Sequence, residues 1–277
     1  MQKYSVLMAV YQRDNPEYFA VALDSMIHQT VPPDEIVIVK DGPITGDLQA
    51  VIDGRKSKTE IHEVSLAENH GLGYALNEGI KACRNELIAR MDADDISKPS
   101  RCEKQLQRFA EKPELSIVGT HIDEFTDEVS HVISQRKVPL ATQEIYEFAK
   151  RRSAFNHPTV MYRKSRVMGY GGYANLRRNQ DVDLFGRMLY GGCKAENVDE
   201  SLLWFRADHG LAARRKSWEN SWSYILTIKR FCDMGYASFL DVFFVAMAQV
   251  GIYLMPERLQ EMFYGFFLRN RQRAAAQ

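Results

Sequence analysis

Glu86-Leu-Ile-Ala-Arg-Met-Asp-Ala-Asp-Asp-Ile-Ser97 carries the strongest structural signal in this chain of 277 residues. Leu87–Met91 has the character of a buried strand, and Asp92, Asp94 and Asp95 follow it directly. Burying carboxylates together is costly, and a hard divalent cation with oxygen ligands is the usual compensation. The segment therefore predicts a strand that delivers a metal ion to the edge of a sheet. Acidic loop tips and helix caps also produce a D-x-D pattern, so its meaning depends on its surroundings.

Buried strands and amphipathic helices alternate before this segment. Apolar runs predict strands at Ser5–Tyr11, Glu35–Val39 and Glu60–Ser65. Helical periodicity predicts helices over residues 16–29, 48–57 and 73–84. This alternation indicates an α/β fold in which helices cover both faces of a mostly parallel, mixed sheet. Ligands of such sheets bind beyond the carboxyl ends of the strands, so the side chains there are expected to converge on one crevice.

The turns after these strands supply candidate nucleotide-binding residues. Asp41, which precedes Gly42, is an acceptor for a base N–H or a ribose hydroxyl, with a simple turn aspartate as the alternative. Asn69-His-Gly-Leu-Gly73 resembles a phosphate loop, but Leu76 stands where the dinucleotide fingerprint needs a third glycine. A plain helix N-terminus is the alternative for this loop. The candidate nucleotide-binding residues are Val10, Tyr11, Arg13, Asp41, Asn69, Gly71, Arg90, Asp92 and Ala93.

A second acidic pair opens a later helix. Asp181 and Asp183 lie near the start of the helix predicted over residues 181–189, where capping and dipole stabilisation would explain both. The functional interpretation is a general base that takes a proton from an attacking hydroxyl, and only one of the two can face the site. His209, after a predicted short strand at Leu202–Phe205, is the candidate third metal ligand. The alternatives are a phosphate contact and no functional role, which is the commoner case for a lone histidine.

Acidic and basic residues balance at 36 each, but they are distributed unevenly. Residues 1–100 are rich in acids, whereas residues 146–178 are strongly basic, with Glu147 as their single acid. This distribution argues against binding of nucleic acid and fits a cation near the acids and an anionic partner near the bases. The four cysteines are scattered without a zinc or disulfide pattern, and no signal peptide is visible, so a cytoplasmic protein is expected.

Four motifs occur in order and together resemble a known family. They are Ser5-Val-Leu-Met-Ala-Val-Tyr11, Ile36-Val-Ile-Val-Lys-Asp-Gly42, Asn69-His-Gly-Leu-Gly-Tyr-Ala-Leu-Asn-Glu-Gly79 and Ile88-Ala-Arg-Met-Asp-Ala-Asp-Asp-Ile-Ser-Lys-Pro99. Over roughly residues 3–210 the chain is similar to family 2 inverting glycosyltransferases with the GT-A fold. Within that family it most resembles the bacterial transferases of exopolysaccharide, capsule and O-antigen synthesis.

The resemblance implies a role for each candidate residue. Asp41 would bind the base of a nucleotide-sugar donor, expected to be a UDP-sugar. Asp92 and Asp94 would hold Mn²⁺ or Mg²⁺ on the donor's pyrophosphate. Asp181 would be the catalytic base that activates a hydroxyl of a glycan or lipid-linked acceptor.

The chain departs from the family pattern in two places. Gln180 replaces the usual first acid of the pair that contains Asp181. Arg206-Ala-Asp-His209 matches the family's late Arg-x-His only loosely, which bears on the metal role of His209.

The resemblance and the change of texture after Ser217 divide the chain into two parts. Residues 1–215 are expected to form the GT-A catalytic domain, with a nucleotide-binding part at 1–120 and an acceptor-binding part at 121–215. Residues 216–277 are expected to form C-terminal helices rich in aromatic residues.

The apolar run Phe239–Met255 falls short of the roughly 20 residues that a membrane span needs. A second aromatic segment ends with Arg269, Arg271 and Arg273, which could face anionic lipid. The helices could pack on the catalytic domain, contact a second subunit as a homodimer, or bind the inner face of the cell membrane through residues 239–273.

Two other functions compete with the transferase. A nucleotidyltransferase that makes sugar nucleotides shares the α/β architecture, but it usually needs an N-terminal glycine-rich loop, and Val10-Tyr-Gln-Arg-Asp14 contains no glycine. A non-catalytic, membrane-associated binding protein is the second alternative, and the intact Asp92, Asp94 and Asp181 argue against it.

Overall fold

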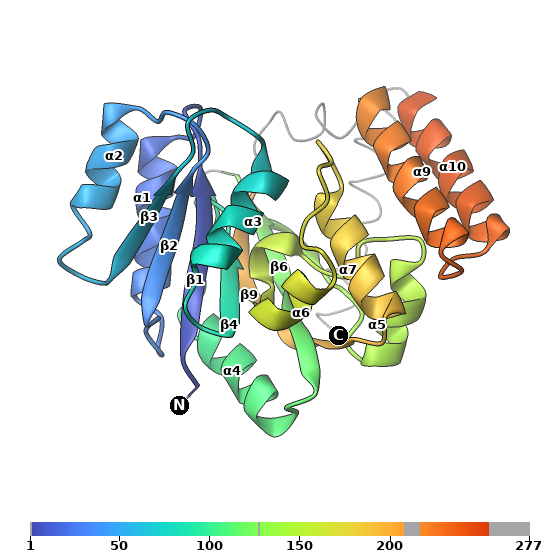
Figure 1. The fold of residues 1–277 in the computed structure, drawn as a ribbon, viewed down its shortest axis with the longest axis horizontal. Helices are drawn as coiled ribbons and strands as arrows, with labels where there is room; N and C mark the ends of the chain where they lie inside the picture. Colours follow the sequence, from blue (N-terminus) through green and yellow to red (C-terminus); the bar gives the residue numbers. More distant parts are fainter. Residues whose placement is uncertain (1, 127, 208–216, 255–277) are drawn as a thin grey trace.

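The computed structural model describes residues 2–126, 128–207 and 217–254. In these residues a nine-stranded mixed sheet is covered by helices on both faces, and two further helices stand at one end (Figure 1). The first eight strands along the sheet are β3 (Ile61–Ser65), β2 (Glu35–Lys40), β1 (Tyr4–Val10), β4 (Leu87–Met91), β8 (Met161–Arg163), β6 (Leu115–Phe125), β9 (Lys194–Arg206) and β5 (Ile96–Ser97). The ninth, β7 (Val132–Arg136), pairs with β6.

The strand directions place the carboxyl ends of four strands at one edge. β1 is parallel to both β2 and β4, and β2 is parallel to β3. β8 is antiparallel to β4 and β6, whereas β6 and β9 are parallel. The turns after β1, β2, β3 and β4 therefore lie at the same edge, as the sequence predicts.

Each face of the sheet has its own apolar core, because successive side chains of a strand point to opposite faces. Val6 and Met8 of β1 pack with three helices, whereas Leu7 packs with helices on the other face. The first set is α1 (Pro16–Ile27), α2 (Gly46–Asp53) and α4 (Arg101–Glu111). The second set is α3 (Leu72–Ala82), α5 (Thr142–Ala149), α6 (Lys164–Gly169) and α7 (Gln180–Tyr190). The predicted α/β fold with helices on both faces is confirmed.

α3 lies unusually close to the sheet because its contact residue is Gly79. A Cβ at this position would lie 2.3 Å from Leu7 Cδ1 and 2.7 Å from Val39 Cγ2. Since real Cβ atoms do not approach other atoms this closely, the glycine sets the distance between α3 and the strands β1 and β2. The close packing places the start of α3 at the sheet edge where the strand-end turns meet.

The second half of the sheet differs from the sequence prediction. β6 and β9 run through residues that looked polar, because Thr120, His121 and Glu124 are buried and hydrogen-bonded. The apolar stretch of residues 158–162 begins with a 3₁₀ turn, η1 (His157–Thr159), and only its end belongs to a strand, β8. Pro158 has no N–H to donate, so it cannot take part in a strand ladder on both sides.

The helices α9 (Trp218–Asp233) and α10 (Phe239–Leu254) lie side by side (Figure 1). Phe231 of α9 packs on Gly186 of α7, where a Cβ would lie 2.0 Å from the ring. Asp241 of α10 pairs with Arg151, which follows α5. The pair of helices is therefore docked on α7 and on the end of α5. None of the helices in the described ranges is both long enough and apolar enough to cross a membrane.

Candidate active site

Three carboxylates meet where β4 ends. Oxygen atoms of Asp92, Asp94 and Asp95 all lie within 4.8 Å of one another. The spacing follows from the chain, because β4 is buried in the sheet and the acids occupy the turn between it and β5. Such a set of oxygen ligands suits a hard divalent cation.

Asp92 is anchored from below by Arg90. The Arg90 side chain is buried, and its Nη1 donates to an Asp92 oxygen at 2.6 Å while Nη2 pairs with the other oxygen. Arg90 is the last residue but one of β4, and Asp92 follows the end of the strand directly, so the turn brings the Asp92 carboxylate back to the Arg90 guanidinium. Arg90 was predicted to contact the donor, and the structure places it beneath Asp92, where it fixes the orientation of that carboxylate.

Asp95 lies deeper than the other two acids. Its Oδ1 accepts a 2.9 Å hydrogen bond from the Arg206 amide, whereas its buried Oδ2 has no hydrogen-bond partner in the described residues. Burial and the neighbouring charges of Asp94 and Asp92 raise its pKa well above the usual range. Loss of hydration and repulsion from Asp92 raise the pKa of Asp94 to about 6. The cluster therefore carries negative charge that its surroundings do not fully compensate.

Asp14 lies within electrostatic reach of this cluster, although it is not one of the predicted site residues. Its side chain accepts a 2.9 Å hydrogen bond from the Tyr11 amide. Burial, together with the charges of Asp94 and Asp92, raises its pKa to about 7. The strand-end rule could have found it, because Asp14 lies in the same turn as Tyr11 and Arg13.

Asp41 joins two of the sequence motifs. Its Oδ1 accepts from the His70 amide at 2.8 Å, and its Oδ2 accepts from the Gly71 amide and from Asn69 Nδ2, both at 3.0 Å. The amide of Asp41 in turn donates to the Val10 carbonyl at 2.8 Å. The predicted convergence of these turns is therefore present.

Glycine permits the close contact at this junction. Gly42 has a φ of +84°, and a Cβ there would lie 2.8 Å from the amide nitrogen of Asn69. The turn after β2 can thus approach the loop before α3. Among the remaining candidates, Val10 and Ala93 are buried, whereas Tyr11 and Arg13 are exposed at the same edge.

Asp181 faces a cavity that also contains Asp92. The cavity has a volume of about 430 Å³ and lies between the end of β4 and the start of α7. Burial raises the pKa of Asp181, and nearby backbone amides and the charge of Arg90 oppose this rise. Asp183, two residues further along α7 and therefore on roughly the opposite side of the helix, pairs instead with Arg187 at 2.8 Å. Of the two acids that open α7, Asp181 is the one at the cavity.

His157 and the C-terminal helices complete the wall. His157 Nε2 lies 2.8 Å from the Tyr173 hydroxyl, and burial together with the charge of Arg90 holds the His157 pKa well below its usual range. The opposite wall comes from Asn220 and Tyr224 of α9 and from Gln249 and Ile252 of α10. A small molecule in this cavity would touch the end of β4, the start of α7 and both C-terminal helices.

His209, the candidate third metal ligand, lies outside the described residues. The same holds for Arg269, Arg271 and Arg273 of the predicted membrane contact.

The sequence of residues 5–171 matches the family model described as "Glycosyl transferase family 2". An uncharacterized glycosyltransferase from Haemophilus influenzae is 36% identical over 97% of this chain and 100% of its own length. The Escherichia coli protein named UDP-Gal:alpha-D-GlcNAc-diphosphoundecaprenol beta-1,3-galactosyltransferase is 33% identical over 97% of both chains. The Erwinia amylovora amylovoran biosynthesis glycosyltransferase AmsE is 30% identical over 94% of this chain and 97% of its own.

Solved structures share the fold. A mannosyltransferase from Pyrobaculum calidifontis, in complex with GDP-Man and Mn²⁺, superposes with a TM-score of 0.65 at 15% identity and covers 91% of this chain and 70% of its own. S. aureus TarS in complex with UDP gives a TM-score of 0.64 at 15% identity and covers 93% of this chain and 73% of its own. These structures have the GT-A fold, and the present chain has it as well.

Proposed function

Because this chain belongs to glycosyltransferase family 2 and is a glycosyltransferase, we propose that it moves a sugar from a UDP-sugar to a hydroxyl of a lipid-linked saccharide, with inversion at the anomeric carbon. The observation that carries this proposal is the shared cavity of Asp92 and Asp181. A donor held beside Asp92 would present its anomeric carbon to an acceptor hydroxyl beside Asp181. One displacement from the opposite face then inverts the configuration.

The proposed donor and acceptor follow the named relatives. The E. coli relative is named for a UDP-galactose donor and a GlcNAc-diphosphoundecaprenol acceptor, and the E. amylovora relative for amylovoran biosynthesis. Both names support a place in the synthesis of a bacterial surface polysaccharide. In this chain Asp41, Asn69 and Gly71 would bind the nucleoside, with Val10, Tyr11, Arg13 and Ala93 beside them.

A divalent metal, Mn²⁺ or Mg²⁺, fits the acidic cluster. Asp95 Oδ2 is buried without a partner in the described residues, and crowding of the acids raises the pKa of Asp94. A cation on Asp92 and Asp94 would relieve this repulsion, and Arg90 holds Asp92 in place for it. When bound, such an ion supplies charge neutralisation for the departing diphosphate.

The chain's own residues perform the proton transfer. Asp181 would accept the proton of the acceptor hydroxyl as the oxygen attacks, because its carboxylate faces the cavity while Asp183 is occupied by Arg187. Its raised pKa brings it nearer to the working pH, which favours a general base. Tyr173 and His157 would exclude water from this side of the cavity.

We assign donor binding and acceptor binding to different parts of the chain. Residues 1–120 would bind the donor and residues 121–215 the acceptor, with α9 and α10 closing the acceptor side. The face of α10 with Phe239, Phe243 and Met247 is exposed in the described residues and would contact the inner face of the cell membrane. A homodimer through the same face is the alternative.

A transfer assay tests the proposed function. Purified protein is incubated with UDP-galactose and a GlcNAc-diphosphate ester of a long alcohol, with Mn²⁺, with EDTA, and with EDTA followed by excess Mn²⁺. We expect product with Mn²⁺, none with EDTA and recovery on re-addition. The NMR coupling constant of the new linkage should report a β-glycoside, because the donor is an α-glycoside. An α-linked product would contradict inversion, and undiminished activity in EDTA would contradict the metal role.

A further inference from the structure

The cavity of Asp181 opens into two further hollows along α10. The next hollow, of about 440 Å³, shares Tyr224, Gln249 and Ile252 with it. A third hollow, of about 960 Å³, shares Arg151, Arg152 and Phe244 with the second. Because neighbouring hollows share lining residues, they lie next to one another in a row along α10, and we call this row the α10 groove. It runs from the catalytic cavity to the outer surface near the start of α10.

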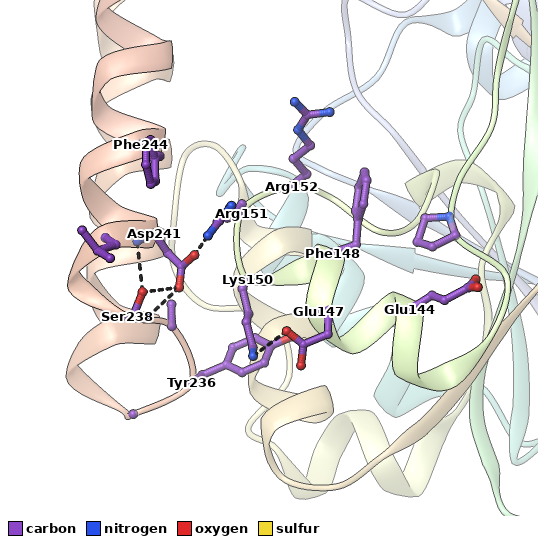
Figure 2. Close-up of a pocket in the computed structure, with 14 residues that line it drawn as sticks. Glu144, Glu147, Phe148, Lys150, Arg151, Arg152, Tyr236, Ser238, Asp241 and Phe244 are labelled. Atoms are coloured by element: carbon purple, nitrogen blue, oxygen red, sulfur yellow. Dashed lines mark hydrogen bonds and ion pairs between the residues drawn. The ribbon is translucent and has the colours of Figure 1, made fainter.

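The two walls of the α10 groove differ in chemistry. Figure 2 shows its outer part, with Phe244 of α10 on one side and Arg151, Arg152 and Phe148 on the other. Further inward the α10 wall is made of Val245, Ala248 and Ile252. The α10 wall is mainly apolar apart from Asp241 and Gln249, and the opposite wall carries three cations together with Glu144 and Glu147. A ligand that matches both walls has an anionic group and a hydrocarbon chain.

Arg152 is the cation that remains for a ligand. Arg151 is paired with Asp241, and Lys150 with Glu147 at 2.8 Å, as the dashed lines in Figure 2 show. Within the described ranges the guanidinium of Arg152 forms no hydrogen bond or ion pair, and it lies 5.9 Å from the ring centroid of Phe148. An anion in the α10 groove would thus meet one uncompensated positive charge.

Tyr224 connects this charge to the catalytic end. Its hydroxyl donates a 3.2 Å hydrogen bond to the Arg151 carbonyl. Burial and the charge of Asp181 raise the pKa of Tyr224, whereas the charge of Arg152 lowers it, so the hydroxyl lies within electrostatic reach of both. Asp181 lines the first hollow, Tyr224 the first and the second, and Arg152 the second and the third, so the three residues follow one another in this order along the α10 groove.

We propose that the α10 groove binds the diphosphate and the adjoining hydrocarbon of a lipid-linked acceptor, with Arg152 on the diphosphate and the α10 wall on the hydrocarbon. This inference rests on the proposed function, because the acceptor sugar would then lie beside Asp181. An arginine is suited to phosphate because its planar guanidinium offers two parallel donors. The apolar wall would make the free energy of binding more favourable in proportion to the area of the hydrocarbon that it buries.

A binding experiment in EDTA tests the inference without turnover, so that the acidic cluster cannot hold a metal–pyrophosphate complex. The probes are farnesyl diphosphate, farnesol and inorganic pyrophosphate, titrated calorimetrically into the full chain. Arg152→Ala and Phe244→Ala are compared with Arg166→Ala, a control at an exposed arginine of α6. Thermal unfolding of each variant verifies that it folds.

We expect farnesyl diphosphate to bind more tightly than either part alone. Arg152→Ala should weaken its binding about tenfold, since one charge-assisted contact is lost, and should leave farnesol binding unchanged. Phe244→Ala should weaken both isoprenoid probes, and Arg166→Ala neither. Equal affinity of wild type and Arg152→Ala for farnesyl diphosphate would overturn the inference. So would pyrophosphate binding as tightly as farnesyl diphosphate.

Two further measurements separate this inference from the alternatives. If Arg152→Ala weakens binding to phosphatidylglycerol vesicles and not to farnesyl diphosphate, the α10 groove meets a membrane surface and the acceptor assignment is wrong. UDP-galactose turnover with Mn²⁺ is measured on the same proteins. Turnover without Arg152-dependent binding contradicts the α10 groove alone, and Arg152-dependent binding without turnover of any UDP-sugar contradicts the proposed function.

Discussion

Arg90 lies directly beneath Asp92 and contacts both of its carboxylate oxygens from a buried position in β4. The pair places a positive charge under the acidic cluster before any cation arrives. It also leaves Asp94 and Asp95 without an equivalent partner for their full charge. The cluster is therefore partly, and asymmetrically, neutralised by the fold itself.

Replacing Arg90 should destabilise the protein more when no metal is present. Arg90→Met leaves Asp92 beside two other carboxylates, and we expect a loss of about 3 kcal/mol in the free energy of unfolding, since Asp92 still reaches solvent. Urea denaturation with and without Mn²⁺ measures the loss, and Mn²⁺ should restore more stability to Arg90→Met than to wild type. Arg90→Lys, which keeps the charge, should lose less. Equal stability of Arg90→Met and wild type would show that the pair has no such role.

The two acids that open α7 should give opposite phenotypes. Asp181→Asn removes the proposed base, and turnover should fall by about 10²–10⁴-fold because a positioned base contributes that much. UDP binding and the melting temperature should hardly change. Asp183→Asn instead breaks the contacts to Arg187 and should lower the melting temperature while the folded fraction keeps its turnover number. A loss of UDP binding in Asp181→Asn would place that residue in the donor site.

His157 should make the protein less stable in mild acid. Its pKa is lowered in the folded state, so between pH 7.5 and 5.5 the unfolded chain gains a proton that the folded chain does not. Stability attributable to this residue is therefore intact above pH 6.5 and is lost as the pH falls, by about 1.4 kcal/mol at pH 5.5. Urea denaturation of wild type and His157→Gln at both pH values isolates the effect, because the other histidines titrate in both proteins. An identical pH dependence of the two would rule out a depressed pKa.

Gly186→Ala should loosen α9 from the catalytic domain. The added Cβ would meet the Phe231 ring, and overpacking of this kind typically costs about 1–3 kcal/mol. Because α9 also supplies Asn220 and Tyr224 to the cavity, turnover should fall with stability. Hydrogen exchange of α9 amides would report the loosening directly. Phe231→Leu in the Gly186→Ala background makes room for the methyl group and should recover part of both losses.

The first half of the fold could be predicted because its signals are local. Apolar runs define β1 to β4, helical periodicity defines the helices between them, and parallel strands bring their ends together wherever they occur. This is why Asp41, Asn69 and Asp92 could be grouped before any coordinates existed. Local patterns leave the metal role of Asp92 and Asp94 and the base role of Asp181 open, and the family resemblance assigns both roles.

The second half depends on contacts between distant segments, which local patterns do not record. The buried polar side chains of β6 look like surface residues in sequence, and only their hydrogen bonds explain the burial. The pKa of Asp14 is raised by burial and by the charges of Asp92 and Asp94, which lie far along the chain. The same is true of Tyr224, which was predicted only as part of a C-terminal helix and in fact lines the cavity of Asp181.

One wall of the cavity comes from residues late in the sequence, since Gln249 and Ile252 belong to α10. During synthesis the strands β1 to β4 emerge first, so the acidic cluster and the turn of Asp41 are made long before this wall. The wall can form only after residue 252 has left the ribosome and α9 has packed on Gly186. A nascent chain therefore carries the acidic cluster before the cavity around it can be closed.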